Sequence, residues 1–153
     1  MTTTEQNAPQ IDQKTLEAYQ AQALETLRET SRKLDVEVSK AVYPFGGTVA
    51  VAGIGYLQLS TVTPMEFTNG VKLTYLGKGG GLVFGGGAYA GGGAFTRDPA
   101  SLVGKEVAFV LGGGGGLLYV TWILDGVLIG EGVFAGISVF AGSGGGSGPF
   151  QRA

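Results

Sequence analysis

The sequence contains no cysteine and no histidine among its 153 residues. The absence of cysteine excludes a disulfide framework and thiol chemistry, and it leaves the redox compartment undetermined. The absence of histidine excludes imidazole bases, the usual serine triads and histidine-ligated metal sites. We therefore expect a protein that is not an enzyme and that has no catalytic residue, no metal site and no cofactor.

Charged residues are also scarce: they make up 14% of the chain, and the net charge is −2. Nucleic-acid binding depends on cationic contacts to phosphate, and the sequence has no basic cluster, so we expect no nucleic-acid partner. The first ten residues, MTTTEQNAPQ, lack the basic segment followed by an apolar segment that forms a secretory signal peptide. We expect a cytoplasmic protein or one exported by a non-classical route.

Glycine, in contrast, is abundant, and its distribution divides the chain. All 30 glycines lie between Gly46 and Gly148, and none lies in the first 45 residues. This change in composition predicts a structural boundary. We expect residues 1–10 to be disordered, residues 11–42 to form an amphipathic helix, and residues 46–150 to form a glycine-rich β domain.

The segment before the glycines has the apolar periodicity of a helix. Asp12 is placed to cap its start, and Pro44 with Gly46 ends it. We expect the apolar face to pack on the β domain or to pair with a second copy in a homo-oligomer. A membrane-surface helix is the alternative, which the mixed signs of the polar face weaken. The spacings of three, four and seven define a candidate face formed by Leu16, Tyr19, Ala23, Leu27 and Leu34.

Turn signals divide the glycine-rich part into short strands. Asp125-Gly126 lies between apolar, β-branched runs, and Asn69-Gly70 is a second signal of this kind, so both predict tight hairpins. With Asp125 and Gly126 as the turn residues, Trp122 faces Ile129, Val120 faces Glu131, and Tyr119 covers Gly132. Residues 98–104, DPASLVG, predict one helical turn with Asp98 as its cap.

These strands predict a mainly β fold, a closed eight-stranded antiparallel β-barrel with one short helix, preceded by the amphipathic helix. Glycine within a strand is normally destabilising, so its repetition requires a geometric reason. A small closed barrel supplies one, because its strands must kink and approach closely. The alternative is a disordered low-complexity region, which the bulky residues between the glycines disfavour.

Both faces of the hairpin around Asp125-Gly126 are apolar, and one of them must be covered from outside the barrel. The cover is the N-terminal helix, a second subunit, a lipid surface or a partner protein, since large exposed apolar patches are uncommon on soluble monomers. The candidate interaction surface consists of Leu118, Val120, Trp122, Leu124, Val127, Ile129 and Val133.

The glycine runs do not match the loops that bind phosphate. Gly77-Lys78 is followed by Gly79, and Gly104-Lys105 is followed by Glu106, whereas a phosphate-binding loop requires serine or threonine after the lysine. The carboxylates of the glycine-rich part show no spacing that indicates an acid–base pair.

Three segments resemble the virulence-associated protein (Vap) family, small secreted proteins of an actinobacterial intracellular pathogen. They are LTYLGKGGGLVFGGGAYAGGGAF (73–95), the DPASLVG turn, and residues 117–150, whose glycine tail ends at Phe150 where the family carries tryptophan. The resemblance implies an eight-stranded Greek-key barrel with a filled interior and no catalytic site. It also implies a role in altering the host endolysosomal compartment through membranes or host proteins.

The functional hypothesis from the sequence is a non-enzymatic, effector-like barrel that binds a membrane or a host or partner protein. One alternative is a membrane-permeabilising, toxin-like protein whose N-terminal helix detaches and inserts. A second alternative is a barrel that binds a small ligand at its mouth.

Overall fold

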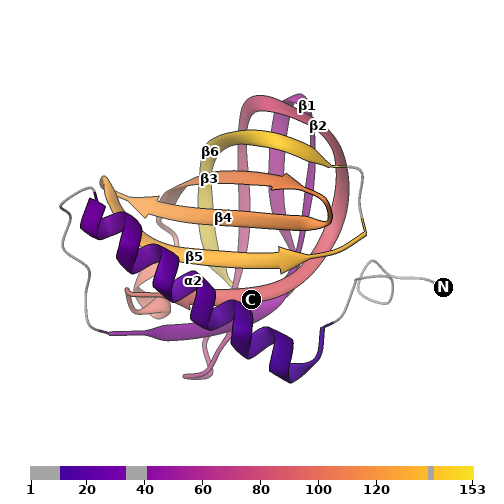
Figure 1. The fold of residues 1–153 in the computed structure, drawn as a ribbon. Coiled ribbons are helices and arrows are strands. Elements are labelled where there is room, and N and C mark those ends of the chain that lie inside the picture. Colours follow the sequence, from indigo (N-terminus) through magenta and orange to yellow (C-terminus); the bar gives the residue numbers. More distant parts are fainter. Residues whose placement is uncertain (1–10, 34–40, 138–139) are drawn as a thin grey trace.

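The structure, a computed structural model, describes residues 11–33, 41–137 and 140–153. Within these residues the chain forms one α-helix, six strands and a short 3-10 helix (Figure 1). The predictions made for residues 1–10 and for Leu34 lie outside the described residues. In chain order the elements are α2 (Gln13–Lys33), β1 (Tyr43–Phe67), β2 (Lys72–Phe95), η1 (Pro99–Leu102), β3 (Glu106–Gly114), β4 (Leu117–Leu124), β5 (Val127–Ala135) and β6 (Ala141–Arg152).

The strands form one antiparallel sheet that closes on itself. Their order is β1-β2-β5-β4-β3-β6, and an additional pairing between β2 and β6 closes the ring. Five strands therefore make the barrel, and β1 lies alongside β2. The order β6-β3-β4-β5 is that of a Greek key, in which the fourth strand returns to lie beside the first. The prediction of a mainly β, closed antiparallel barrel is confirmed.

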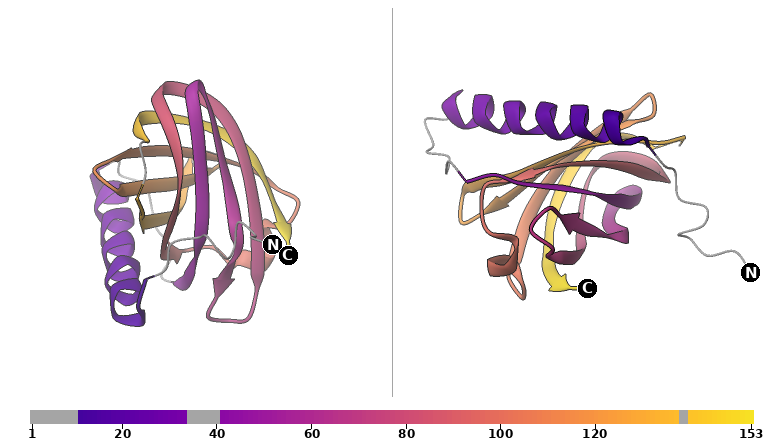
Figure 2. Two further views of the ribbon diagram at one scale, coloured as in Figure 1. Left: turned by 90° about the vertical axis from the view of Figure 1, so that its right-hand side faces the viewer. Right: turned by 90° about the horizontal axis from the view of Figure 1, so that it is seen from below.

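The predicted number of eight strands is wrong, because two strands continue through glycines where we expected breaks. β1 has 25 residues and β2 has 24. Their pairing register shifts between Ile54 and Tyr56, where Gly55 has a φ of 74°, so the strands bend at a bulge without ending. Both strands bend at one end of the barrel, and the turn that joins them lies at the opposite end (Figure 2).

The predicted turns and caps are confirmed. Asp125 and Gly126 have φ values of 52° and 78°, the left-handed geometry that a type I′ hairpin requires. Gly70, with a φ of 90°, makes the second hairpin. The carboxylate of Asp98 accepts a hydrogen bond from the Ala100 N–H at 3.0 Å and caps η1.

Beyond the Asp125-Gly126 turn, the predicted facing pairs are wrong. Leu124 pairs with Val127 as expected, but Trp122 pairs with Gly130, so Ile129 is an extra residue on β5. This β-bulge shifts every later pairing by one position, which exchanges the inner and outer faces of β5. Consequently Glu131 lies opposite Thr121 on the outer face, and Val120 lies opposite Gly132 inside the barrel. Tyr119 pairs with Val133 and does not cover Gly132.

The inward-facing glycines make room for aromatic rings. A Cβ atom on Gly130 would lie 2.7 Å from the ring of Phe95, and one on Gly132 would lie 2.6 Å from the ring of Phe134. The rings meet at centroid distances such as 5.3 Å between Phe95 and Trp122. The interior is therefore filled, with an aromatic core made of Phe45, Phe67, Tyr75, Phe95, Phe109, Trp122, Phe134 and Phe150.

The helix α2 lies across the outer faces of β2 and β5 (Figure 1). It begins after Asp12, whose carboxylate accepts a hydrogen bond from the Thr15 N–H at 2.7 Å. Hydrogen bonding by the side chain and then by the backbone of Thr15 lowers the pKa of Asp12. Of the predicted helix face, Ala23 and Leu27 are fully buried, and Leu16 and Tyr19 are half-buried. The apolar stripe of the helix thus covers part of the barrel.

Two glycines of the barrel lie against the start of α2. A Cβ atom on Gly46 would lie 3.1 Å from one methyl group of Leu16, and a Cβ atom on Gly92 would lie 2.5 Å from the other. Gly46 and Gly92 are paired across β1 and β2. The missing side chains therefore allow the helix to approach the sheet closely.

Candidate interaction surface

The interaction surface predicted from the sequence is wrong, because its side chains are buried. Leu118, Val120 and Trp122 are at most 1% exposed and point into the barrel. Closure of the sheet turned this face of the hairpin inward, where it fills the core. The remaining members are also buried or half-buried: Leu124, Val127 and Ile129 belong to the core or pack against it, and Val133 is buried on the outer face.

The structure brings a different set of apolar side chains together on the outside, at the bends of β1 and β2. Ile54 is 76% exposed, Leu82 is 89% exposed and Phe84 is 64% exposed. Ile54 lies directly opposite Phe84 on the neighbouring strand. Leu82 precedes Phe84 by two positions and therefore projects from the same face of β2. Tyr56, which follows the bulge on β1, is 54% exposed.

Small residues surround these side chains, which we call the apolar patch (Ile54, Tyr56, Leu82 and Phe84). On β6, Leu82 pairs with Ser143 and Phe84 with Ala141, and on β2 the partner of Tyr56 is Gly80. The patch therefore stands out from a surface of small residues. The helix α2 lies away from these bends (Figure 2).

The strands that carry the apolar patch contain almost no charge. Residues 41–65 of the β1 segment and residues 140–151 of the β6 segment have no charged side chain, and residues 73–96 have Lys78 alone. Lys78 pairs with Gln58 and Ser147 in the sheet, two positions along β2 from the partner of Tyr56. Placing the patch in an apolar environment thus requires the desolvation of few ionic groups.

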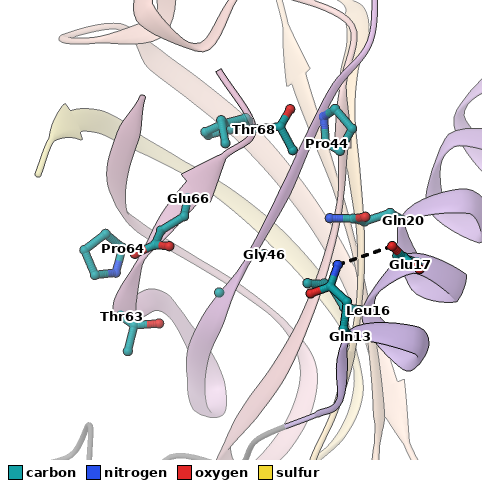
Figure 3. A pocket seen from close by; sticks show the side chains of 12 residues that line it. Gln13, Leu16, Glu17, Gln20, Pro44, Gly46, Thr63, Pro64, Glu66 and Thr68 are labelled. Atoms are coloured by element: carbon teal, nitrogen blue, oxygen red, sulfur yellow. Dashed lines mark hydrogen bonds between the residues drawn. The ribbon is translucent and has the colours of Figure 1, made fainter. Parts of the chain in front are cut away.

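An open groove of about 670 Å³ lies between the start of α2 and β1 (Figure 3). Gln13, Glu17 and Gln20 face it from the helix, and Gln20 donates a hydrogen bond from Nε2 to the Phe45 carbonyl oxygen at 2.9 Å. Glu66 faces it from β1 but forms a 3.7 Å ion pair with Lys72. The groove lies outside the barrel, whose interior is filled by the aromatic core.

The outer face of the barrel also contains a buried carboxyl group that the sequence analysis did not identify as functional. Glu131 is 4% exposed, and the Thr121 hydroxyl donates to its two carboxyl oxygens at 2.5 and 2.9 Å. Burial raises the pKa of Glu131 to about 7, and the hydrogen bond from Thr121 opposes this shift. The environment of Glu131 depends on the bulge at Ile129, and no residue pattern in the sequence predicts this bulge.

Over residues 11–33, 41–137 and 140–153, no cluster of three or more Asp or Glu residues is arranged to hold a metal ion. The described helix does not combine the length and the apolar character that are needed to cross a membrane.

The sequence matches no protein-family model and no curated protein. The structure, however, is similar to the virulence-associated protein VapD from the intracellular pathogen Rhodococcus equi, with a TM-score of 0.64 and 17% identity over 72% of this chain and 99% of VapD. It is also similar to VapB from the same pathogen, with a TM-score of 0.54 and 23% identity over 73% of this chain and 97% of VapB. The resemblance noted in the sequence is thus confirmed at the level of the fold: the chain has the fold of the Rhodococcus equi virulence-associated proteins.

Proposed function

We propose that this chain is a non-enzymatic barrel that attaches to lipid surfaces through its apolar patch. The observation that supports the proposal is the clustering of four large, exposed apolar side chains on paired strands. Clusters of this kind mark interaction sites, because water-exposed apolar surface is unfavourable. The fold shared with VapD and VapB supports an effector-like role in association with a host as part of the same proposal.

The form of the patch favours a lipid surface over a partner protein. A specific protein interface buries roughly 800 Å² on each partner and requires two surfaces of complementary shape. The apolar patch instead presents protruding side chains among small residues, and a fluid bilayer needs no matching shape. Transfer of each aliphatic or aromatic side chain from water contributes about 1.5–3 kcal/mol. Tyr56 carries the polar tip that suits the boundary between lipid and water.

The toxin-like alternative requires α2 to leave the barrel, because the side chains that would enter a bilayer are used in packing. Ala23 and Leu27 are fully buried between the helix and the sheet. The apolar patch is exposed without any such rearrangement, and for this reason we prefer it as the membrane-binding element.

Co-sedimentation of the full chain with phosphatidylcholine vesicles, with and without an anionic lipid, tests the proposal. We expect the wild type to sediment with both kinds of vesicle and to resist release by salt, since the patch is uncharged. The double variant Leu82→Ser/Phe84→Ser should lose at least about tenfold in binding, because most of the exposed apolar area disappears.

The matched control is Leu76→Ser/Val110→Ser, which changes two other exposed apolar residues, 43% and 48% exposed, outside the patch. It should bind as the wild type does. The fluorescence of Trp122 in the core reports whether each variant is folded. A wild type that stays in the supernatant with both vesicles contradicts the proposal, as does an equal loss of binding in the two double variants.

A further inference from the structure

The carboxyl group of Glu131 lies on the face of the barrel that α2 covers. On β2, the face that carries Gly92 touches Leu16 of the helix. Ala94 shares this face, since it lies two positions further along the strand, and Ala94 pairs with Glu131 on β5. Ala94 and Val133, both on this outer face, are 1% and 2% exposed although they point away from the core. We attribute this burial to α2.

Within the described part of the chain, the groups around Glu131 offer it hydrogen bonding but no opposite charge. On β4 its neighbour is the Thr121 hydroxyl, and on β2 it is Ala94. The buried residues of α2 are Ala23, Leu27 and Ser31. The charged side chains described on α2 are all exposed: Lys14, Glu17, Glu25, Arg28, Glu29, Arg32 and Lys33.

We propose that α2 is a pH-sensitive cover, which docks on the barrel while the Glu131 carboxyl group is protonated and is released when that group ionises. A protonated carboxyl group fits an apolar interface with one hydroxyl partner. A carboxylate in the same place lacks a cation, and it regains its hydration only when the helix moves away. The raised pKa of Glu131, near 7, agrees with this geometry and places the transition close to neutral pH.

Release of the cover changes the surface of the protein. Leu128 and Val133, 7% and 2% exposed in the docked state, lie on the outer face of β5 and become accessible when α2 leaves. A released α2 loses the tertiary packing of its apolar face, which supplies most of the stability of a helix in a protein. Acid therefore favours the closed form, and neutral to alkaline pH favours a form with a second exposed apolar surface. This inference does not depend on lipid binding by the apolar patch.

A single cysteine placed under the helix tests the proposal directly, because the chain has no cysteine of its own. Ser31 is 1% exposed, and its hydroxyl has no hydrogen-bond partner among the described residues, so Ser31→Cys preserves size at a buried position of α2. The rate at which 4,4′-dithiodipyridine modifies this thiol measures how often the helix opens. The rates are compared between Ser31→Cys and Ser31→Cys/Glu131→Gln from pH 5 to pH 8.

Thiol ionisation affects both proteins equally. The rate for Ser31→Cys divided by the rate for Ser31→Cys/Glu131→Gln therefore reports the effect of Glu131 alone. We expect this ratio to rise by at least about tenfold from pH 5 to pH 8, since glutamine cannot ionise. Ser31→Cys/Glu106→Gln is the control, because Glu106 is an exposed carboxylate that accepts a hydrogen bond from Ser147 at 2.9 Å. It should behave like Ser31→Cys at every pH. A ratio that stays constant with pH overturns the proposal, and so does full accessibility of the Ser31→Cys thiol at pH 5.

Discussion

The substitution Gly130→Ala tests whether inward-facing glycines are required by the aromatic core. Its Cβ atom would lie 2.7 Å from two atoms of the Phe95 ring, whereas ordinary contacts begin near 3.4 Å. The ring is fully buried and cannot easily move away. Its centroid lies 5.6 Å from that of Phe45, 5.3 Å from Trp122 and 5.8 Å from Phe150.

The expected destabilisation follows from two opposing effects. Overpacking a filled core destabilises by roughly 1–3 kcal/mol. Replacing glycine with alanine also restricts the unfolded chain, which stabilises by roughly 0.4–1 kcal/mol. Gly114→Ala isolates the second effect, because a Cβ atom there meets nothing within 4 Å and neither glycine has a positive φ. We expect the two variants to differ by about 2 kcal/mol in their free energies of unfolding.

Urea unfolding provides the measurement, with the fluorescence of Trp122, the sole tryptophan, as the probe. Gly130→Ala should lower the midpoint relative to the wild type, and Gly114→Ala should leave it unchanged or raise it, with equal m-values in all three proteins. Equal midpoints for the two variants would refute the reasoning, since they would show that the core accepts a methyl group between β5 and Phe95.

Three further predictions concern the carboxylates and the helix. The pKa of Glu131 is raised from 4.5 to about 7, so its contribution to stability is full below pH 4.5 and is lost as pH rises to 7. The free energy of unfolding falls by about 3 kcal/mol over this range, and urea titrations of Glu131→Gln should not show this fall. A pH profile of stability in this variant equal to that of the wild type contradicts the raised pKa of Glu131. Asp98→Ala should destabilise by about 0.5–2 kcal/mol through loss of the η1 cap, and a melting temperature equal to that of the wild type contradicts this. Leu27→Ala should increase hydrogen exchange throughout α2 but leave the β3 amides protected; equal increases in both would show that helix and barrel unfold together.

Local signals in the sequence were sufficient for the turns, the caps and the fold class. Asp125-Gly126 and Asn69-Gly70 predict hairpins because tight turns need a positive φ, which few residue types adopt readily. The composition change at Gly46 separates helix from strand, and the spacing from Leu16 to Leu27 identifies the buried face of α2. Each of these signals depends on residues close to one another in the chain.

The strand number, the pairing register and the interaction surface depended on contacts between distant segments. The sequence predicts several short strands, but pairing with β2 carries β1 through Gly55 as a bend. The bulge at Ile129 decides that Glu131 lies beneath the helix, and barrel closure decides that Trp122 is buried.

The sequence by itself determined that its glycine-rich part would build a closed β structure and that a helix would precede it. Only the tertiary structure decided which face of each strand is inside, because a shift of one residue exchanges the two faces and costs no local conformational preference. That choice was made by the packing of Phe95 against Gly130 and of Phe45 against Gly132, which bring together residues far apart in the sequence.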